Sequence, residues 1–93
     1  MPIFEWDERK RSLNLALHGI DFIQAVQVFD GSPLVSRSDR NGEVRWVAIG
    51  PLRNGRTVAI AFTRREEAIR IISVRRARPD EEERYGDHRA VRR

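Results

Sequence analysis

Two Asn-Gly dipeptides in the second half of the chain constrain its fold more than any other feature of the sequence. Asn41-Gly42 and Asn54-Gly55 each lie between short runs rich in apolar and β-branched residues. Asparagine and glycine accept the positive φ angles that tight β-hairpin turns require. We therefore expect an antiparallel meander of four strands, over residues 34–38, 43–52, 56–63 and 68–75.

The first half of the chain shows helical rather than strand periodicity. Asp7 and Asp21 are residue types that cap helix N-termini, and the segments 8–18 and 22–29 follow them. Gly19 suits the left-handed position that ends a helix. The apolar residues recur at helical spacing. They are Leu13, Ala16 and Leu17 in the first segment, with Ile20 just after it, and Phe22, Ala25, Val26 and Phe29 in the second. Residues 3–6 suit either a short edge strand or an anchor.

A third helix is expected after the last strand. Pro79 suits the first helical position, and the acidic residues 80–83 suit the first turn of a helix. The basic residues from about 88 to 93 are expected to form a tail. We predict a single α+β domain over residues 1–93, in which two N-terminal helices pack on a four-stranded antiparallel sheet with a C-terminal helix.

Composition excludes several classes of site. The chain has no cysteine, so it forms no disulfide and carries no thiol nucleophile or thiolate metal site. The two histidines, His18 and His88, are far apart in the sequence, and no spacing typical of a metal site or a phosphate-binding loop is present. We therefore expect neither a metal ion nor a cofactor.

The opening residues, MPIFEWDERK, are charged and lack the apolar stretch of a signal peptide. No apolar run approaches the roughly 20 residues that a membrane helix needs. We expect a cytoplasmic protein that makes no contact with a membrane.

The charge of the chain indicates an anionic partner. The formal net charge is +4, and every basic residue except Lys10 is an arginine. The planar guanidinium binds phosphate oxygens bidentately and stacks on bases, which favours a phosphate-bearing partner. A GC-rich genome also enriches arginine over lysine, without any functional cause.

The strand over residues 56–63 has two different faces. Val58, Ile60 and Phe62 alternate with the small residues Thr57, Ala59, Ala61 and Thr63. The small face predicts a shallow trough for an extended polyanion, with Arg45 and either Arg70 or Arg75 at its rim. The register of the strands decides between Arg70 and Arg75. Alternatively, the small face packs against another element, such as the C-terminal helix.

Arginines and one histidine can cleave RNA without a metal ion. The ribose 2′-hydroxyl attacks the adjacent phosphate, and cations stabilise the negative charge that develops. Histidine titrates closest to neutral pH, which makes His18 a candidate base; alternatively, His18 interacts with the last carbonyls of its helix. Lys10 lies on roughly the same side of that helix, and its alternative is an ordinary solvated lysine.

The N-terminal third of the chain resembles the BrnT family of toxins. The resemblance rests on Trp6, Asp7, Lys10, Asn14, His18, Gly19, Ile20, Asp21 and Phe22, and continues in RWVAIG (residues 45–50) and RIISVRRA (residues 70–77). It covers about residues 3–85. Leu17 departs from the pattern, because the family commonly has a lysine before the histidine.

The resemblance implies a RelE-like fold and a type II toxin that inhibits translation by cleaving RNA. It also implies a cognate BrnA-like antitoxin, which neutralises the toxin and binds operator DNA together with it. By position, Arg45 and Arg75 would hold the scissile phosphate, His18 would assist proton transfer or position RNA, and Lys10 would bind the backbone. Further RNA contacts are expected from Arg64, Arg70 and Arg76.

Two other classes of function fit the same residues. A non-catalytic basic module would bind a partner antitoxin and operator DNA, with strongly salt-dependent affinity and no cleavage. A structural subunit would do neither. Trp6 and Trp46 are expected in the core rather than as stacking platforms for bases.

Overall fold

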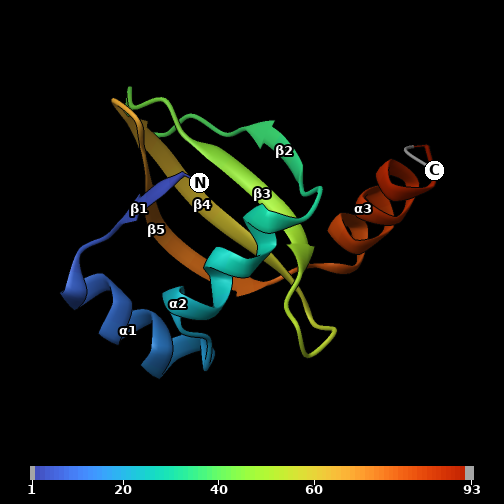
Figure 1. Ribbon diagram of the computed structural model, residues 1–93, viewed down its shortest axis with the longest axis horizontal. Coiled ribbons are helices and arrows are strands. Elements are labelled where there is room, and N and C mark those ends of the chain that lie inside the picture. The colour runs from blue at the N-terminus through green and yellow to red at the C-terminus, as the bar shows by residue number, and fades with distance from the viewer. Residues whose placement is uncertain (1, 92–93) are drawn as a thin grey trace.

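A five-stranded mixed sheet organises the fold (Figure 1). The computed structural model describes residues 2–91. Along the chain the elements are β1 (Ile3–Glu5), α1 (Glu8–His18), α2 (Phe22–Ala25), the 3₁₀ helix η1 (Val26–Asp30), β2 (Leu34–Arg37), β3 (Trp46–Pro51), β4 (Thr57–Arg65), β5 (Ala68–Arg76) and α3 (Pro79–Val91). The expected α+β class is confirmed.

The strand order across the sheet is β1-β5-β4-β3-β2. Strands β2 to β5 form the expected antiparallel meander. The prediction of a four-stranded, wholly antiparallel sheet is wrong, because β1 pairs in parallel with β5, from Ile3 opposite Ala68 to Glu5 opposite Arg70. Three residues are too few to show the alternation of apolar and polar side chains that marks a strand. This segment becomes a strand because it pairs with the open edge of β5.

The expected turns form where the Asn-Gly dipeptides lie. Asn41 and Gly42 have φ angles of 51° and 76°, and Gly55 has a φ of 89°. The first turn closes with paired hydrogen bonds between Arg40 and Glu43. These positive φ values are those that asparagine and glycine adopt with least strain.

The helix caps are confirmed, but the second helix is shorter than predicted. Asp7 and Asp21 both accept backbone N–H groups from their helices, and Gly19 ends α1 with a φ of 69°. The segment after Asp21 begins as α2 and tightens after Ala25 into η1. Short α-helices often end in such 3₁₀ turns.

One face of the sheet carries the main core. Val58, Ile60 and Phe62 of β4 are fully buried there beneath α2 and η1, against Phe22 and Val28. Gly50 of β3 permits the close approach of η1, because a Cβ atom at this position would lie 2.8 Å from a methyl group of Val28.

Helix α1 packs through a polar residue rather than through its leucines. Of the predicted apolar stripe, only Ile20, which follows the helix, is buried, whereas Leu13 and Leu17 are 61% and 75% exposed. The buried residue of α1 is Asn14, which donates to the carbonyl of Ile20 and accepts the N–H of Val74 at 2.9 Å. Val74 belongs to the part of β5 that β1 does not reach, so Asn14 satisfies a backbone group at that open edge.

Helix α3 lies on the opposite face of the sheet and projects from the body at the end away from α1 (Figure 1). Its Tyr85 packs on a small second cluster formed by Ile49, Ala59 and Ala77. Pro79 is the first helical residue, as predicted. The helix continues through Val91, so the predicted tail is helical from 88 to 91, and residues 92–93 of it lie outside the described residues. None of the helices within residues 2–91 is long and apolar enough to span a bilayer.

We expect Asn14→Ala to destabilise the protein by roughly 2–4 kcal/mol, because it leaves a buried N–H and a buried carbonyl without partners. Leu17→Ala, on the exposed side of the same helix, should change the free energy of unfolding by less than about 0.5 kcal/mol. Urea denaturation of both variants tests this. Equal losses would show that α1 is held by its leucines instead.

Candidate functional site

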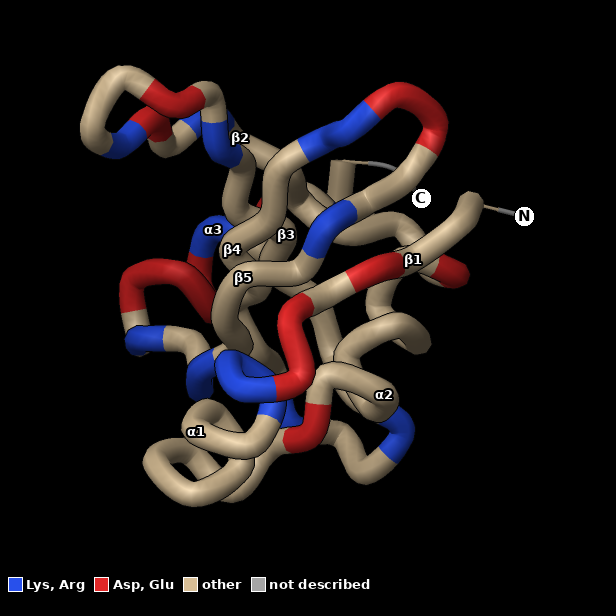
Figure 2. Tube along the Cα trace, turned by 90° about the vertical axis from the view of Figure 1, so that its left-hand side faces the viewer, with Lys and Arg blue, Asp and Glu red and all other residues tan. Residues whose placement is uncertain are grey.

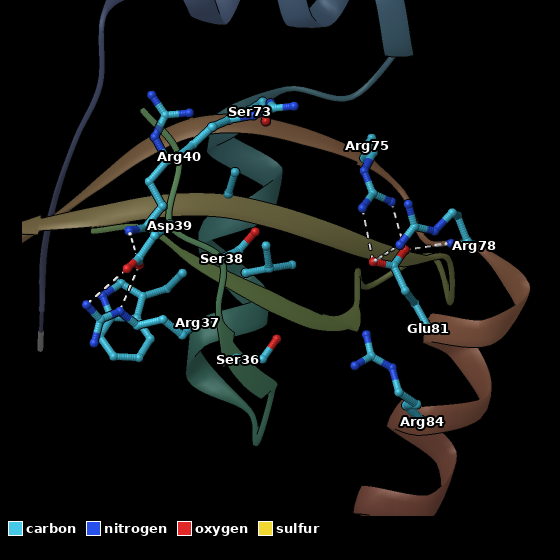
Figure 3. A pocket seen from close by; sticks show the side chains of 14 residues that line it. Ser36, Arg37, Ser38, Asp39, Arg40, Ser73, Arg75, Arg78, Glu81 and Arg84 are labelled. Atoms are coloured by element: carbon cyan, nitrogen blue, oxygen red, sulfur yellow. Dashed lines mark hydrogen bonds and ion pairs between the residues drawn. The ribbon is translucent and has the colours of Figure 1, made fainter. Parts of the chain in front are cut away.

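A groove of about 450 Å³ opens on the sheet face opposite the main core. The β2–β3 hairpin forms one wall, and the exit from β5 with the start of α3 forms the other (Figure 3). Its lining includes six arginines and two acids, namely Arg37, Arg40, Arg45, Arg75, Arg78, Arg84, Asp39 and Glu81. The groove is therefore strongly cationic, as an anion-binding site requires.

The strand register produces the floor of the groove. Ser36, Val47, Ala61 and Ser73 face one another across β2, β3, β4 and β5 in a single row. All four line the groove, and none is large. The next row contains Ile49 and Ala59, and α3 covers it through Tyr85. The predicted trough therefore exists around Ala61, whereas around Ala59 the small face packs against the C-terminal helix.

A β-bulge decides which arginines share this face. The partner of Ala61 is Ser73, but the partner of Phe62 is Ile71, so one residue of β5 is skipped. Without the bulge, Arg70 and Arg75 would point to opposite sides of the sheet because they are an odd number of residues apart. With it, both point away from the main core. Only Arg75 of the two lines the groove, whereas Arg70 lies beside Glu5 at 3.8 Å.

Arg75 is held by a carboxylate from α3. Its Nη1 and Nη2 atoms donate to the two oxygens of Glu81 at 2.7 and 3.0 Å. The Glu81 side chain is 3% exposed and also accepts the backbone N–H of Arg78 at 2.8 Å, as a cap at the start of α3. The hydrogen bonds from Arg75, together with the N–H of Arg78, lower the pKa of Glu81 to about 2, and the same pair raises the pKa of Arg75.

The hairpin wall presents its own arginines with acidic partners. Arg45 donates from Nε to Glu43 at 2.7 Å, and this bond is the main cause that lowers the pKa of Glu43. Arg37 pairs with Asp39 at 2.8 Å and lies over the ring of Trp46 at 5.4 Å. Both arginines are thereby ordered along the rim before any ligand binds.

The remaining predicted site residues do not all gather at the groove. Lys10 lies near the Arg45 end, close enough for its charge to help lower the pKa of Glu43. His18 is exposed at the end of α1 and does not line the groove. Arg64 and Arg76 pair with Ile69 and Val58, which places them on the opposite face of the sheet, the one that carries the main core.

Of the eight charged residues that line the groove, only Arg45 and Arg75 were predicted from the sequence as site residues. Arg84 received no role, and Glu81 was expected only to support the start of a helix. Glu81 and Arg84 are three residues apart in α3, which places both on one side of the helix. Figure 3 shows them on the side that faces Arg75. Figure 2 shows the same acidic start of α3 among the basic segments of the molecule. Within residues 2–91, no group of three or more histidine, aspartate or glutamate side chains is placed to hold a metal ion.

Residues 6–81 match a family model described as the ribonuclease toxin BrnT of a type II toxin–antitoxin system. Among solved structures, the chain is similar to the Brucella abortus ribonuclease toxin BrnT, with 31% sequence identity and a TM-score of 0.71. That match covers 84% of this chain and 99% of the Brucella chain. A search of curated proteins found no match.

The Glu81 carboxylate should make stability depend on pH. Because its pKa falls from 4.5 to about 2 on folding, its contribution is complete above pH 4.5 and is lost as the pH falls toward 2. We expect wild type to exceed Glu81→Gln in free energy of unfolding by roughly 2–3 kcal/mol at pH 7, with the difference disappearing near pH 2.

Urea denaturation between pH 7 and pH 2 measures this difference. Glu82→Gln, at the exposed neighbouring position, should follow the wild-type curve. A difference between wild type and Glu81→Gln that does not change with pH would contradict the assignment.

Proposed function

The chain belongs to the BrnT family of ribonuclease toxins from type II toxin–antitoxin systems, and on this premise we propose that it is an endoribonuclease that cleaves RNA in the arginine groove without a metal ion. The observation that carries the proposal is the row of small residues between two arginine-bearing walls. A single RNA strand lying over this floor would place its phosphates beside Arg45 and Arg75.

The proposed reaction is transfer within the RNA backbone. The 2′-oxygen attacks the neighbouring phosphorus, the bond from phosphorus to the 5′-oxygen breaks, and the products carry a 2′,3′-cyclic phosphate and a 5′-hydroxyl group. The 2′-hydroxyl loses its proton to water, and the departing 5′-oxygen takes one up. Arg45 and Arg75 stabilise the extra negative charge on the phosphate in the transition state, and the groove orients the attacking hydroxyl.

The other predicted residues take roles that suit their places. Lys10 binds the backbone beyond the Arg45 end of the groove. His18 contacts RNA from the end of α1 and positions it, since it does not line the groove. Arg70 extends the cationic face beyond Arg45, while Arg64 and Arg76 contact RNA only where it passes around the sheet.

The proposed partners follow from family membership and charge. A type II toxin has an antitoxin, and we propose a BrnA-like protein whose acidic residues cover the groove and so block RNA. Operator DNA would then be bound only by the toxin–antitoxin complex. In the cytoplasm, the free toxin would inhibit translation by cleaving RNA.

We expect purified protein to cleave a defined RNA in the presence of EDTA and to leave 2′,3′-cyclic phosphate ends. Arg75→Ala and Arg45→Ala should each lower kcat by about 100-fold, which is typical when one charge-stabilising donor is lost. Arg56→Ala removes an exposed arginine outside the groove and should cleave like wild type. His18→Ala should raise KM more than it lowers kcat. Cleavage that requires a divalent ion would overturn the mechanism.

Salt-dependent nucleic-acid binding is expected of both the nuclease and a non-catalytic module, so the salt slope is measured together with cleavage. Each groove arginine that contacts a phosphate should contribute about 0.7 to the slope of log affinity against log salt for single strands. We expect Arg45→Ala and Arg75→Ala each to reduce the slope by about that amount, and Arg56→Ala to leave it unchanged. Filter binding with a 2′-deoxy oligonucleotide measures it. If the protein binds with this slope but does not cleave the matching RNA, the result would favour the non-catalytic module that binds operator DNA together with an antitoxin.

A further inference from the structure

Glu81 is the only charged residue within the described part of the chain that is buried. A glutamate at this helix position does not need burial to act as a cap, since a solvated side chain could accept the same N–H group. Burial of a carboxylate is costly unless its oxygens are fully bonded. Here the bonds come from Arg75 and from the Arg78 backbone, so the burial of Glu81 serves its contact with the groove arginine.

The contact uses only one edge of the guanidinium. An arginine has five N–H donors arranged as an end fork, formed by Nη1 and Nη2, and a side fork, formed by Nε and Nη2. Glu81 occupies the end fork, and the second N–H of Nη1 lies toward the carbonyl of Arg76 at 3.3 Å. Within residues 2–91, the N–H of Nε and the second N–H of Nη2 of Arg75 have no acceptor. The side chain of Arg75 is 36% exposed.

We propose that Glu81 is a positioning residue for Arg75, which holds the guanidinium by its end fork so that the side fork receives a phosphate in the groove. A phosphate can accept both N–H groups of that fork, as it does in other bidentate arginine contacts. This inference rests on the proposed function for its substrate, RNA, but its geometry concerns any phosphate group that enters the groove.

If Glu81 instead blocked phosphate from Arg75, a role that we call a latch, the predictions would be reversed. A latch would mimic the phosphate and occupy the same donors, so its removal would increase both binding and cleavage. A positioning residue leaves a second fork open, so its removal lets the guanidinium rotate away. Glu81→Gln also makes the groove more positive by one charge, which by itself would strengthen binding of an anion. A fall in kcat with no rise in KM is therefore specific to positioning.

The first test uses wild-type protein and inorganic phosphate, observed by ¹⁵N–¹H NMR of the arginine side chains at low temperature. We expect the Nε–H signal of Arg75 to shift on titration. The separate Nη signals, which report slow rotation while Glu81 is bound, should persist at saturating phosphate. Loss of the separate Nη signals as phosphate binds would overturn the proposal, because it would show that phosphate displaces Glu81. An unchanged Nε–H signal would also overturn it.

The second test compares Glu81→Gln with the matched exposed control Glu82→Gln, after both are shown to fold. Glu81→Gln should merge the Nη signals of Arg75, reduce the phosphate-induced Nε–H shift severalfold, and lower kcat for RNA at least 10-fold with KM within about twofold of wild type. Glu82→Gln should match wild type throughout. Faster cleavage by Glu81→Gln would identify a latch and refute positioning.

The two proposals fail in different ways. If wild-type protein does not cleave RNA while its Arg75 signals respond to phosphate as expected, the ribonuclease proposal fails and the positioning of Arg75 stands. If RNA is cleaved normally by Glu81→Gln, the positioning role fails and the ribonuclease proposal stands.

Discussion

The alternation of side chains along β4 is the constraint on which the rest of the structure depends. Val58, Ile60 and Phe62 must be shielded from water, and α2 and η1 cover them. The small residues Ala59 and Ala61 therefore lie on the other side of the sheet. Helix α3 covers only the row that contains Ala59. The uncovered row becomes the floor of the groove, and burial of one face thus creates the site on the other.

Charge at the groove is ordered rather than simply accumulated. Arg37, Arg45 and Arg75 each bind a carboxylate that holds the guanidinium at the rim. The exposed pairs of Arg37 and Arg45 contribute little to stability, but all three pairs limit the rotation of long side chains before an anion arrives. Glu81 differs from the other acids because it is buried, and so it joins the site to the packing of α3 against the sheet.

Local signals in the sequence predicted much of the fold. The Asn-Gly turns, the aspartate caps, Gly19 and Pro79 act over a few residues, so their outcome hardly depends on distant contacts. For residues 3–6 the sequence left an edge strand and an anchor as alternatives, and the edge strand β1 forms because the free edge of β5 is available to it. The outward leucines of α1 could not be predicted in this way, because a buried Asn14, bonded across 60 residues to Val74, determines which side of that helix packs.

By itself, the sequence determined the α+β class, the meander, the cationic character and the resemblance to a toxin family, since each depends on local pattern or composition. Only the tertiary structure decided which arginines meet. The bulge in β5 turns Arg70 and Arg75 to one face, strand register separates Arg64 and Arg76 from the groove, and α3 brings Glu81 to Arg75. Register and helix docking depend on contacts between distant segments, which no local pattern specifies.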